Sequence, residues 1–166
     1  MTIYVTSDSH FYHANIIKYC ERPFKSVEEM NQRMITNWNR VVKLKDTVLH
    51  LGDFCLSCTN KQLRELRDQL NGGIWLLPGN HDYPMRLKNY DIFVLSQWRE
   101  ENTMLYKDII FSHRPLVDVP TGLTNVHGHI HNHSSYGRHI NVSVDATNFT
   151  PVKLEDIIKK AKEISK

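Results

Sequence analysis

Cysteine, glycine and long apolar runs are all scarce in this sequence. Its 166 residues include three cysteines, which cannot all pair, so a disulfide-stapled scaffold is excluded and a reducing compartment is favoured. No apolar run approaches the roughly 20 residues that cross a bilayer, and the N-terminus has neither a basic leader nor a small-residue cleavage site. We therefore expect a soluble, cytoplasmic protein with no membrane partner.

Blocks of like charge are also missing. The net charge of +3 comes from Lys and Arg residues scattered along the chain, which does not demand a nucleic-acid partner and would not repel a phosphate. The composition implies no obligatory protein partner and leaves the oligomeric state open. Apolar residues make up 40% of the chain, which is enough for a buried core. With no linker or internal repeat, we predict one domain over residues 1–166.

Strands and helices alternate along the first half. Short β-branched runs predict buried strands, and Ser26 with Glu29 and Thr59 with Gln62 have the spacing of N-terminal capping boxes. The predicted strands are residues 3–6, 47–51 and 74–77, and the predicted helices are residues 14–20, 26–42 and 59–70. Short strands follow at 103–106, 109–112, 125–129 and 140–144, and a final helix follows Pro151. This order predicts an α/β fold with a βαβ first half and a β-rich second half.

Polar side chains that can bind metals follow five of these strands. The chain has ten histidines, and seven of them come after residue 80. In chain order the strand ends carry Asp8 and His10, Asp53, Asn80 and His81, His113, and His129 and His131. Strand ends are where α/β sheets place their sites, so we expect these side chains to converge.

Spacing and glycine content support this convergence. Asp8 and His10 are two residues apart, as are His129 and His131, so an extended chain would turn both members of each pair to the same side. Gly52, Gly79 and Gly128 permit tight turns and a close approach of backbone to ligand.

The donor types narrow the choice of ion. Two carboxylates, four imidazoles and one amide oxygen suit Mn, Fe, Zn, Co or Ni, and do not suit calcium or a thiolate zinc site. Seven donors exceed the needs of one ion. Two ions that share one carboxylate would use them all and would lie about 3.5–4 Å apart.

This ordered series of motifs resembles the calcineurin-like metallophosphoesterase family. The likeness extends from Asp8 to His131, and the strings 7–11 (SDSHF) and 50–54 (HLGDF) resemble a compact subgroup from bacteria and phages. The resemblance implies two packed mixed β-sheets flanked by helices. It also implies two groups of metal ligands: Asp8, His10 and His131 for one ion, Asn80, His113 and His129 for the other, and Asp53 as the bridge.

The resemblance further implies a reaction. A hydroxide that bridges two divalent ions, with manganese favoured, attacks the phosphorus of a phosphate ester, and His81 faces the leaving oxygen as a proton donor. The chain has no insertion long enough for a lid domain, which favours phosphodiesters that resemble nucleotides. The alternatives are a phosphomonoesterase of the same fold, a non-catalytic metal-binding interaction module and a histidine-rich metal-storage protein.

Other residues near these motifs have weaker interpretations. Arg114 is a candidate phosphate contact, and His13 either lines the rim of the site or caps a helix. Arg22 and Arg86 could also contact phosphate, but a solvated surface position is the default for both. Asp82 either orients a histidine by accepting its hydrogen bond or serves as a helix N-cap or turn residue.

The remaining histidines and cysteines are predicted to be structural. His50 and His127 lie within strand-like runs and should be core histidines, whereas His133 and His139 should be exposed in a polar loop over residues 132–138 and just beyond. Cys55 and Cys58 have the spacing of a metal or redox pair, but without a second pair they are expected to be buried thiols.

Overall fold

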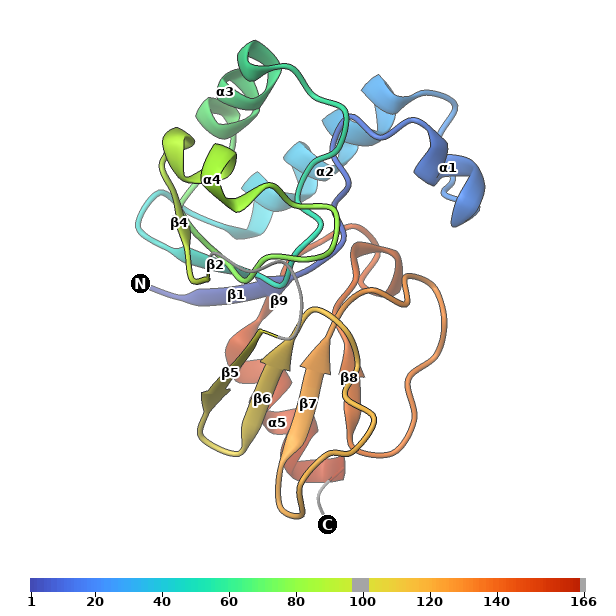
Figure 1. Cartoon of the computed structure of the whole chain (residues 1–166), viewed down its shortest axis with the longest axis vertical. Helices are drawn as coiled ribbons and strands as arrows, with labels where there is room; N and C mark the ends of the chain where they lie inside the picture. The colour runs from blue at the N-terminus through green and yellow to red at the C-terminus, as the bar shows by residue number, and fades with distance from the viewer. Residues whose placement is uncertain (97–101, 165–166) are drawn as a thin grey trace.

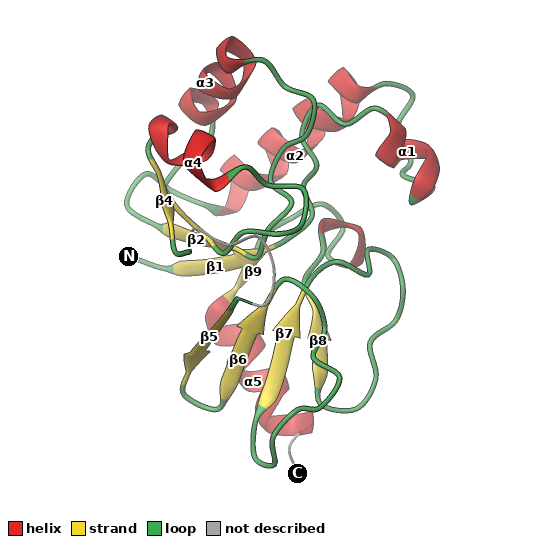
Figure 2. Ribbon diagram, in the orientation of Figure 1, coloured by secondary structure: helices red, strands yellow, loops and turns green. Residues whose placement is uncertain are grey.

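Two β-sheets pack against each other in the computed structural model, which describes residues 1–96 and 102–164 (Figure 1). The first sheet has the strand order β4-β3-β2-β1-β9, and the second has the order β5-β6-β7-β8. Helices α2, α3 and α4 cover the outer side of the first sheet, and α5 lies behind the second (Figure 2). The predicted fold class, two mixed sheets flanked by helices, is confirmed.

The elements have the following bounds. The first sheet contains β1 (Ile3–Thr6), β2 (Thr47–His50), β3 (Gly73–Leu76), β4 (Ile92–Val94) and β9 (Val152–Lys153). The second contains β5 (Thr103–Tyr106), β6 (Ile109–Ser112), β7 (Thr124–His127) and β8 (His139–Asn141). The helices are α1 (Asn15–Tyr19), α2 (Val27–Val41), α3 (Asn60–Gln69), α4 (Pro84–Leu87) and α5 (Leu154–Ile164), with 3₁₀ turns η1 (Lys88–Tyr90) and η2 (Val144–Ala146).

Parallel pairing brings the carboxyl ends of most strands to one region. Strands β1 to β4 pair in parallel, as do β6, β7 and β8, while β9 and β5 run antiparallel to their neighbours. The register aligns Thr6 with His50 and His50 with Leu76. The loops after β1, β2 and β3 therefore leave the first sheet side by side and meet the loops after β6 and β7.

The core has two layers because buried strands present apolar side chains on both faces. Tyr4 of β1 belongs to the cluster under the helices, whereas its neighbour Val5 packs between the two sheets. Trp38 of α2 is 2% exposed in the first cluster, and Phe111 of β6 is 1% exposed in the second. Burying a large apolar side chain stabilises a fold by about 1.5–3 kcal/mol, so these two layers hold the strand ends in place.

Several elements of the structure differ from those predicted from the sequence. Strands β4 and β9 and helix α4 were not predicted; they have three, two and four residues and carry too short a pattern to detect. Thr59 and Gln62 do form a capping box. At α2 the box is incomplete: Ser26 accepts the Glu29 N–H, but the Glu29 carboxylate accepts the Lys25 N–H and not that of Ser26.

Candidate metal centre

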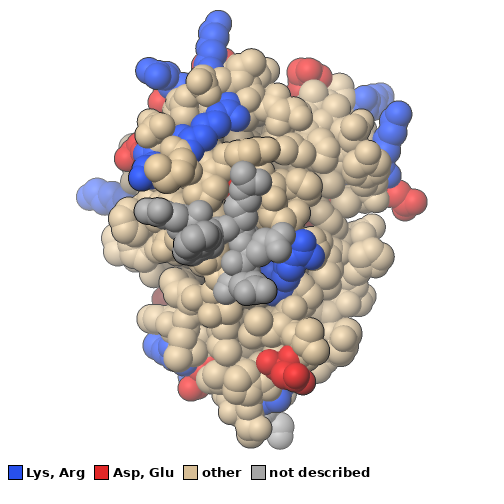
Figure 3. Space-filling view, in the orientation of Figure 1, with Lys and Arg blue, Asp and Glu red and all other residues tan. Residues whose placement is uncertain are grey.

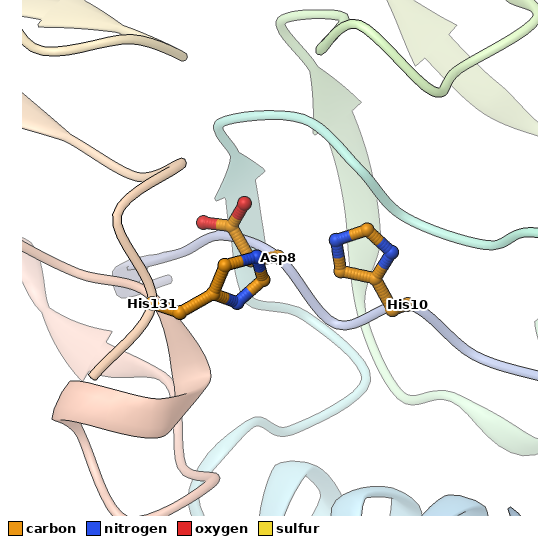
Figure 4. Close-up of side chains that lie close together, drawn as sticks. All are labelled: Asp8, His10 and His131. Atoms are coloured by element: carbon orange, nitrogen blue, oxygen red, sulfur yellow. The ribbon is translucent and has the colours of Figure 1, made fainter. Parts of the chain in front are cut away.

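The loops after β1 and β7 bring Asp8, His10 and His131 together around a common space (Figure 4). One donor atom from each of these side chains lies within 4.8 Å of the others. Asp8 is fully buried and His10 is 2% exposed. We call this trio the first ligand group.

Two atoms of the first ligand group lack the partners that their burial demands. Asp8 Oδ2 accepts hydrogen bonds from the His129 N–H and the Ser143 hydroxyl, both at 2.8 Å. Asp8 Oδ1 and His10 Nε2 have no hydrogen-bond partner among the described residues. Buried polar atoms without partners are costly, and a divalent cation is the partner that suits a carboxylate oxygen and an imidazole nitrogen side by side.

A second ligand group, Asp53, His113 and His129, also has its donor atoms within 4.8 Å of one another. His113 Nδ1–H donates to the Leu51 carbonyl at 2.8 Å, which leaves Nε2 as an acceptor in the neutral ring. That Nε2 lies 3.0 Å from Asn80 Oδ1, a second acceptor. Two acceptors at this distance repel each other unless a cation lies beside them, so this group also fits a divalent ion.

Asp53 connects the two groups. Its Oδ2 lies 3.4 Å from His10 Nε2 and 3.5 Å from His113 Nε2. Its Oδ1 accepts the His81 N–H at 2.9 Å. Burial raises the pKa of this carboxyl, but the neighbouring His10 and His113 outweigh burial and hold the pKa below its usual range. One carboxylate oxygen is thus positioned between both sets of donors.

The backbone at these positions is not extended, and the alternation predicted for the two pairs is wrong. Asp8, His10, His129 and His131 have φ values of 57°, 49°, 69° and 50°, and Asp53 has a φ of 56°. All five lie in the left-handed region, which Asp and His adopt more readily than most residues. The side chains converge because the chain turns sharply after each strand, which ends earlier than predicted at His127 in β7.

Two glycines allow the loops to approach this closely, as predicted. A Cβ added at Gly79 would collide with Asp53 Oδ1, and one added at Gly128 would collide with Asp8 Oδ2. Both positions therefore require glycine for contact with a ligand carboxylate, not for a positive φ.

Asp82 ties the loops after β2 and β3 together. It is fully buried, and its carboxylate accepts the N–H groups of Asp53 at 2.7 Å and of Phe54 and Gly79 at 2.9 Å. Burial, reinforced by the charge of Asp53, raises the pKa of Asp82 to about 7 despite these three bonds. Asp82 orients backbone and no histidine, so the prediction of a histidine partner is wrong and a turn role is correct.

Asp145 is the site residue that the sequence did not reveal. Its Oδ2 lies 2.9 Å from His131 Nδ1, which leaves His131 Nε2 for a ligand. Burial lowers the pKa of His131, but the hydrogen bond to Asp145 raises it to about 10. Carboxylates commonly orient metal-ligating histidines in this way. Asp145 belongs to no motif and lies 14 residues beyond His131, so its only signal was a carboxylate after a predicted strand.

Arg22 is buried, and the default prediction of a solvated surface position is wrong. It is 4% exposed, pairs with Asp145 at 2.8 Å and donates to the Asp8 and Ser9 carbonyls. Arg86 donates hydrogen bonds to the Cys58 carbonyl at 2.6 Å and to the Asn60 side-chain oxygen. Both cations therefore support loops through hydrogen bonds to backbone carbonyls.

The candidate substrate residues surround the ligand groups. His81 is exposed, and its ring centroid lies 5.6 Å from that of His10. His13 is half-buried with Nδ1 3.3 Å from His10 Nδ1, and burial, with His10 and His81 nearby, lowers its pKa to about 4. The exposed Arg114 donates to His129 Nε2 at 2.8 Å. A cavity of about 460 Å³ beside the site is lined by His10, His13 and His81.

The other histidines and the cysteine pair follow the predictions with one exception. His50 and His127 are fully buried, and His133 is exposed. The prediction that His139 is exposed in a loop is wrong. His139 begins β8, is half-buried, and packs on His127 with 5.4 Å between the ring centroids. Cys55 and Cys58 are buried free thiols with their sulfurs 3.1 Å apart.

Charge and hydropathy add two observations. Lys and Arg are spread over the face shown in Figure 3 rather than gathered in one block. Within residues 1–96 and 102–164, no helix is long and apolar enough to cross a membrane.

Comparisons with known proteins agree with this geometry. The chain is 42% identical to the uncharacterized protein MJ1445 from Methanocaldococcus jannaschii over 168 residues, which covers 95% of this chain and 89% of that protein. The crystal structure of AQ665 from Aquifex aeolicus, a protein of unknown function, superimposes with a TM-score of 0.74 at 26% identity, covering 96% of this chain and 98% of the other. The sequence pattern that defines calcineurin-like phosphoesterases matches residues 1–163. Two clusters of metal-binding side chains at the strand ends thus coincide with a family match over nearly the whole chain, and the protein belongs to the calcineurin-like phosphoesterase family.

Proposed function

We propose that the protein is a phosphodiesterase that uses two divalent metal ions and acts on nucleotide-like esters. Membership of the family indicates a hydrolase of phosphate esters. The observation that carries the finer proposal is the position of Asp53 Oδ2, which lies within 3.5 Å of one histidine from each ligand group. A carboxylate in that position can bridge two ions.

Each ligand group would hold one ion. Asp8, His10 and His131 provide the first set of donors, and His113, His129 and Asn80 provide the second, with Asp53 shared. Manganese suits this mixture of oxygen and nitrogen donors. When bound, the ions would lower the pKa of a water molecule between them and neutralise the phosphate oxygens.

The protein's own side chains would orient the ester and donate a proton to the leaving oxygen. Asp145 keeps His131 Nδ1 hydrogen-bonded, so that only Nε2 faces the site. Arg114 lies beside His129 and can bind a phosphate oxygen. His81 is exposed beside His10, where it can protonate the leaving oxygen.

Hydrolysis assays with manganese-loaded protein test this proposal. Bis-p-nitrophenyl phosphate should be hydrolysed with a higher kcat/KM than p-nitrophenyl phosphate, and metal analysis should find two ions per chain. A preference for the monoester would instead identify a phosphomonoesterase of the same fold. Binding of two ions without hydrolysis of either ester would support a non-catalytic metal-binding module.

The role of His81 can be tested through the leaving group. An alkoxide departs slowly without a proton, whereas nitrophenolate is weakly basic and leaves largely unaided. We expect His81→Ala to lower turnover by about 10²–10⁴ on an alkyl or nucleoside ester and by much less on a nitrophenyl ester. Metal content should stay unchanged. Equal losses on both esters would rule out proton donation, and loss of metal would make His81 a ligand.

A further inference from the structure

A second cavity lies on the other side of the loop that carries His129. We call it the Tyr136 cavity; its volume is about 560 Å³, within the roughly 300–1,000 Å³ of small-molecule sites. His129, Ile130 and His133 line this cavity and also the cavity that contains His10 and His81. A molecule whose phosphate lies at the metal centre can therefore extend past His129 into the Tyr136 cavity.

The lining of the Tyr136 cavity combines apolar and aromatic side chains with histidines and serines. Leu116, Val117 and Tyr136 are among the lining residues. Val117 is 98% exposed and Tyr136 is 85% exposed, so neither side chain contributes to the core. The Tyr136 ring centroid lies 5.9 Å from that of His139. None of the described lining residues is Asp, Glu, Lys or Arg. These walls suit an uncharged planar ring that stacks on an aromatic side chain.

We propose that the Tyr136 cavity binds the nucleoside of the ester, on the side of the phosphate that stays attached after hydrolysis. This assignment rests on the proposed phosphodiesterase function. A nucleoside supplies a planar ring for Tyr136 and a sugar that reaches the phosphate. His81, which would face the leaving oxygen, lines the other cavity and not this one, so the leaving group and the nucleoside occupy different cavities.

Two esters with the same leaving group test this assignment. Thymidine 5′-p-nitrophenyl phosphate and methyl p-nitrophenyl phosphate both release nitrophenolate, and only the first carries a nucleoside. We expect Tyr136→Ala to raise KM for the thymidine ester about tenfold, the size of a lost base–aromatic stack, and to leave the methyl ester unchanged. Tyr136→Phe, which keeps the ring, should behave as the parent protein does.

Tyr19→Ala is the matched control, because Tyr19 is 71% exposed and lines the cavity that contains His81. It should not change KM for the thymidine ester. The assignment would be overturned if Tyr19→Ala raised the KM for the thymidine ester and Tyr136→Ala did not. It would also be overturned if the parent protein and the Tyr136→Ala variant had the same KM for each ester.

A binding measurement separates this assignment from the proposed function. Calorimetric titration of the manganese-loaded protein with thymidine 5′-monophosphate should show binding that Tyr136→Ala weakens about tenfold. If neither ester is hydrolysed but this difference in binding remains, the nucleoside site stands and the phosphodiesterase function fails. If both esters are hydrolysed and the variant binds the nucleotide as tightly as the parent does, the nucleoside site fails alone.

Discussion

The two ligand groups are built from similar donors but are supported differently. In the first, His131 is held by Asp145, which is paired in turn with the buried Arg22, and both side chains of that ion pair are at most 3% exposed. In the second, His113 is held by a backbone carbonyl, and His129 contacts the exposed Arg114. The first group is therefore fixed by a buried ion pair, while the second is supported by a backbone carbonyl and an exposed arginine.

Removing the shared carboxylate charge at Asp53 should have the largest effect on the site. We expect Asp53→Asn to lower activity by about 10³-fold or more, beyond the loss of a single electrostatic contact, and to weaken binding of the second ion. Metal analysis and hydrolysis assays check this, with the exposed Asp118→Asn as the control. If the variant keeps two tightly bound ions, Asp53 is not a bridge.

Asp145→Asn should weaken only the first group. The amide cannot hold His131 as the carboxylate does, so affinity for one ion should fall by about 10–100-fold, while the other ion stays bound. Calorimetric titration with Mn²⁺ resolves the two sites. The matched control is Asp91→Asn, because Asp91 also pairs with an arginine, Arg67, but is 91% exposed. Equal weakening of both sites would mean that the groups share their support.

Asp82→Asn tests the support of the loops that carry Asp53 and Asn80. An amide has one acceptor oxygen and cannot replace both carboxylate oxygens toward three backbone N–H groups. We expect the free energy of unfolding to fall by about 1–3 kcal/mol, measured by urea denaturation of the metal-free protein. An unchanged midpoint would show that the loops hold their shape without Asp82.

The smallest effect is expected at Cys55 and Cys58. Neither thiol belongs to a ligand group, and two hydroxyls can replace their mutual contact of 3.1 Å. The double variant with Cys55→Ser and Cys58→Ser should keep its metal content and its hydrolysis rate, with a small change in stability from altered packing. Loss of metal from the folded variant would reveal a thiolate site.

The sequence predicted which side chains lie close together better than it predicted the local backbone geometry. Side chains such as Asp53 and His113 were identified because each follows an apolar run, and parallel strands deliver their ends to one place. The sharp turns at Asp8 and His10 were not predictable from spacing two residues apart, which is equally compatible with an extended chain. Asp145 and Arg22 were missed because their partnership joins positions 123 residues apart, a contact that only tertiary packing creates.

The short edge strands β8 and β9 were also not fully predictable from sequence patterns. Strand β9 is two residues long, and its antiparallel pairing with β1 depends on where α5 docks. His139 was expected in a loop, but its neighbour Ile140 is buried and holds the segment in β8. Long amphipathic helices such as α2 have a repeating pattern of apolar residues that can be detected in the sequence. Such short strands form only because they pair with a neighbouring strand.

The positive φ angles at the metal centre affect how any alanine scan of this site is interpreted. At Asp8, His10, Asp53, His129 and His131, alanine removes the donor atom but leaves a side chain in a backbone conformation that costs about 1–2 kcal/mol. Glycine removes the donor and relieves the backbone together. A glycine variant at any of these positions should therefore be more stable than the alanine variant, and the difference measures the backbone strain in each loop.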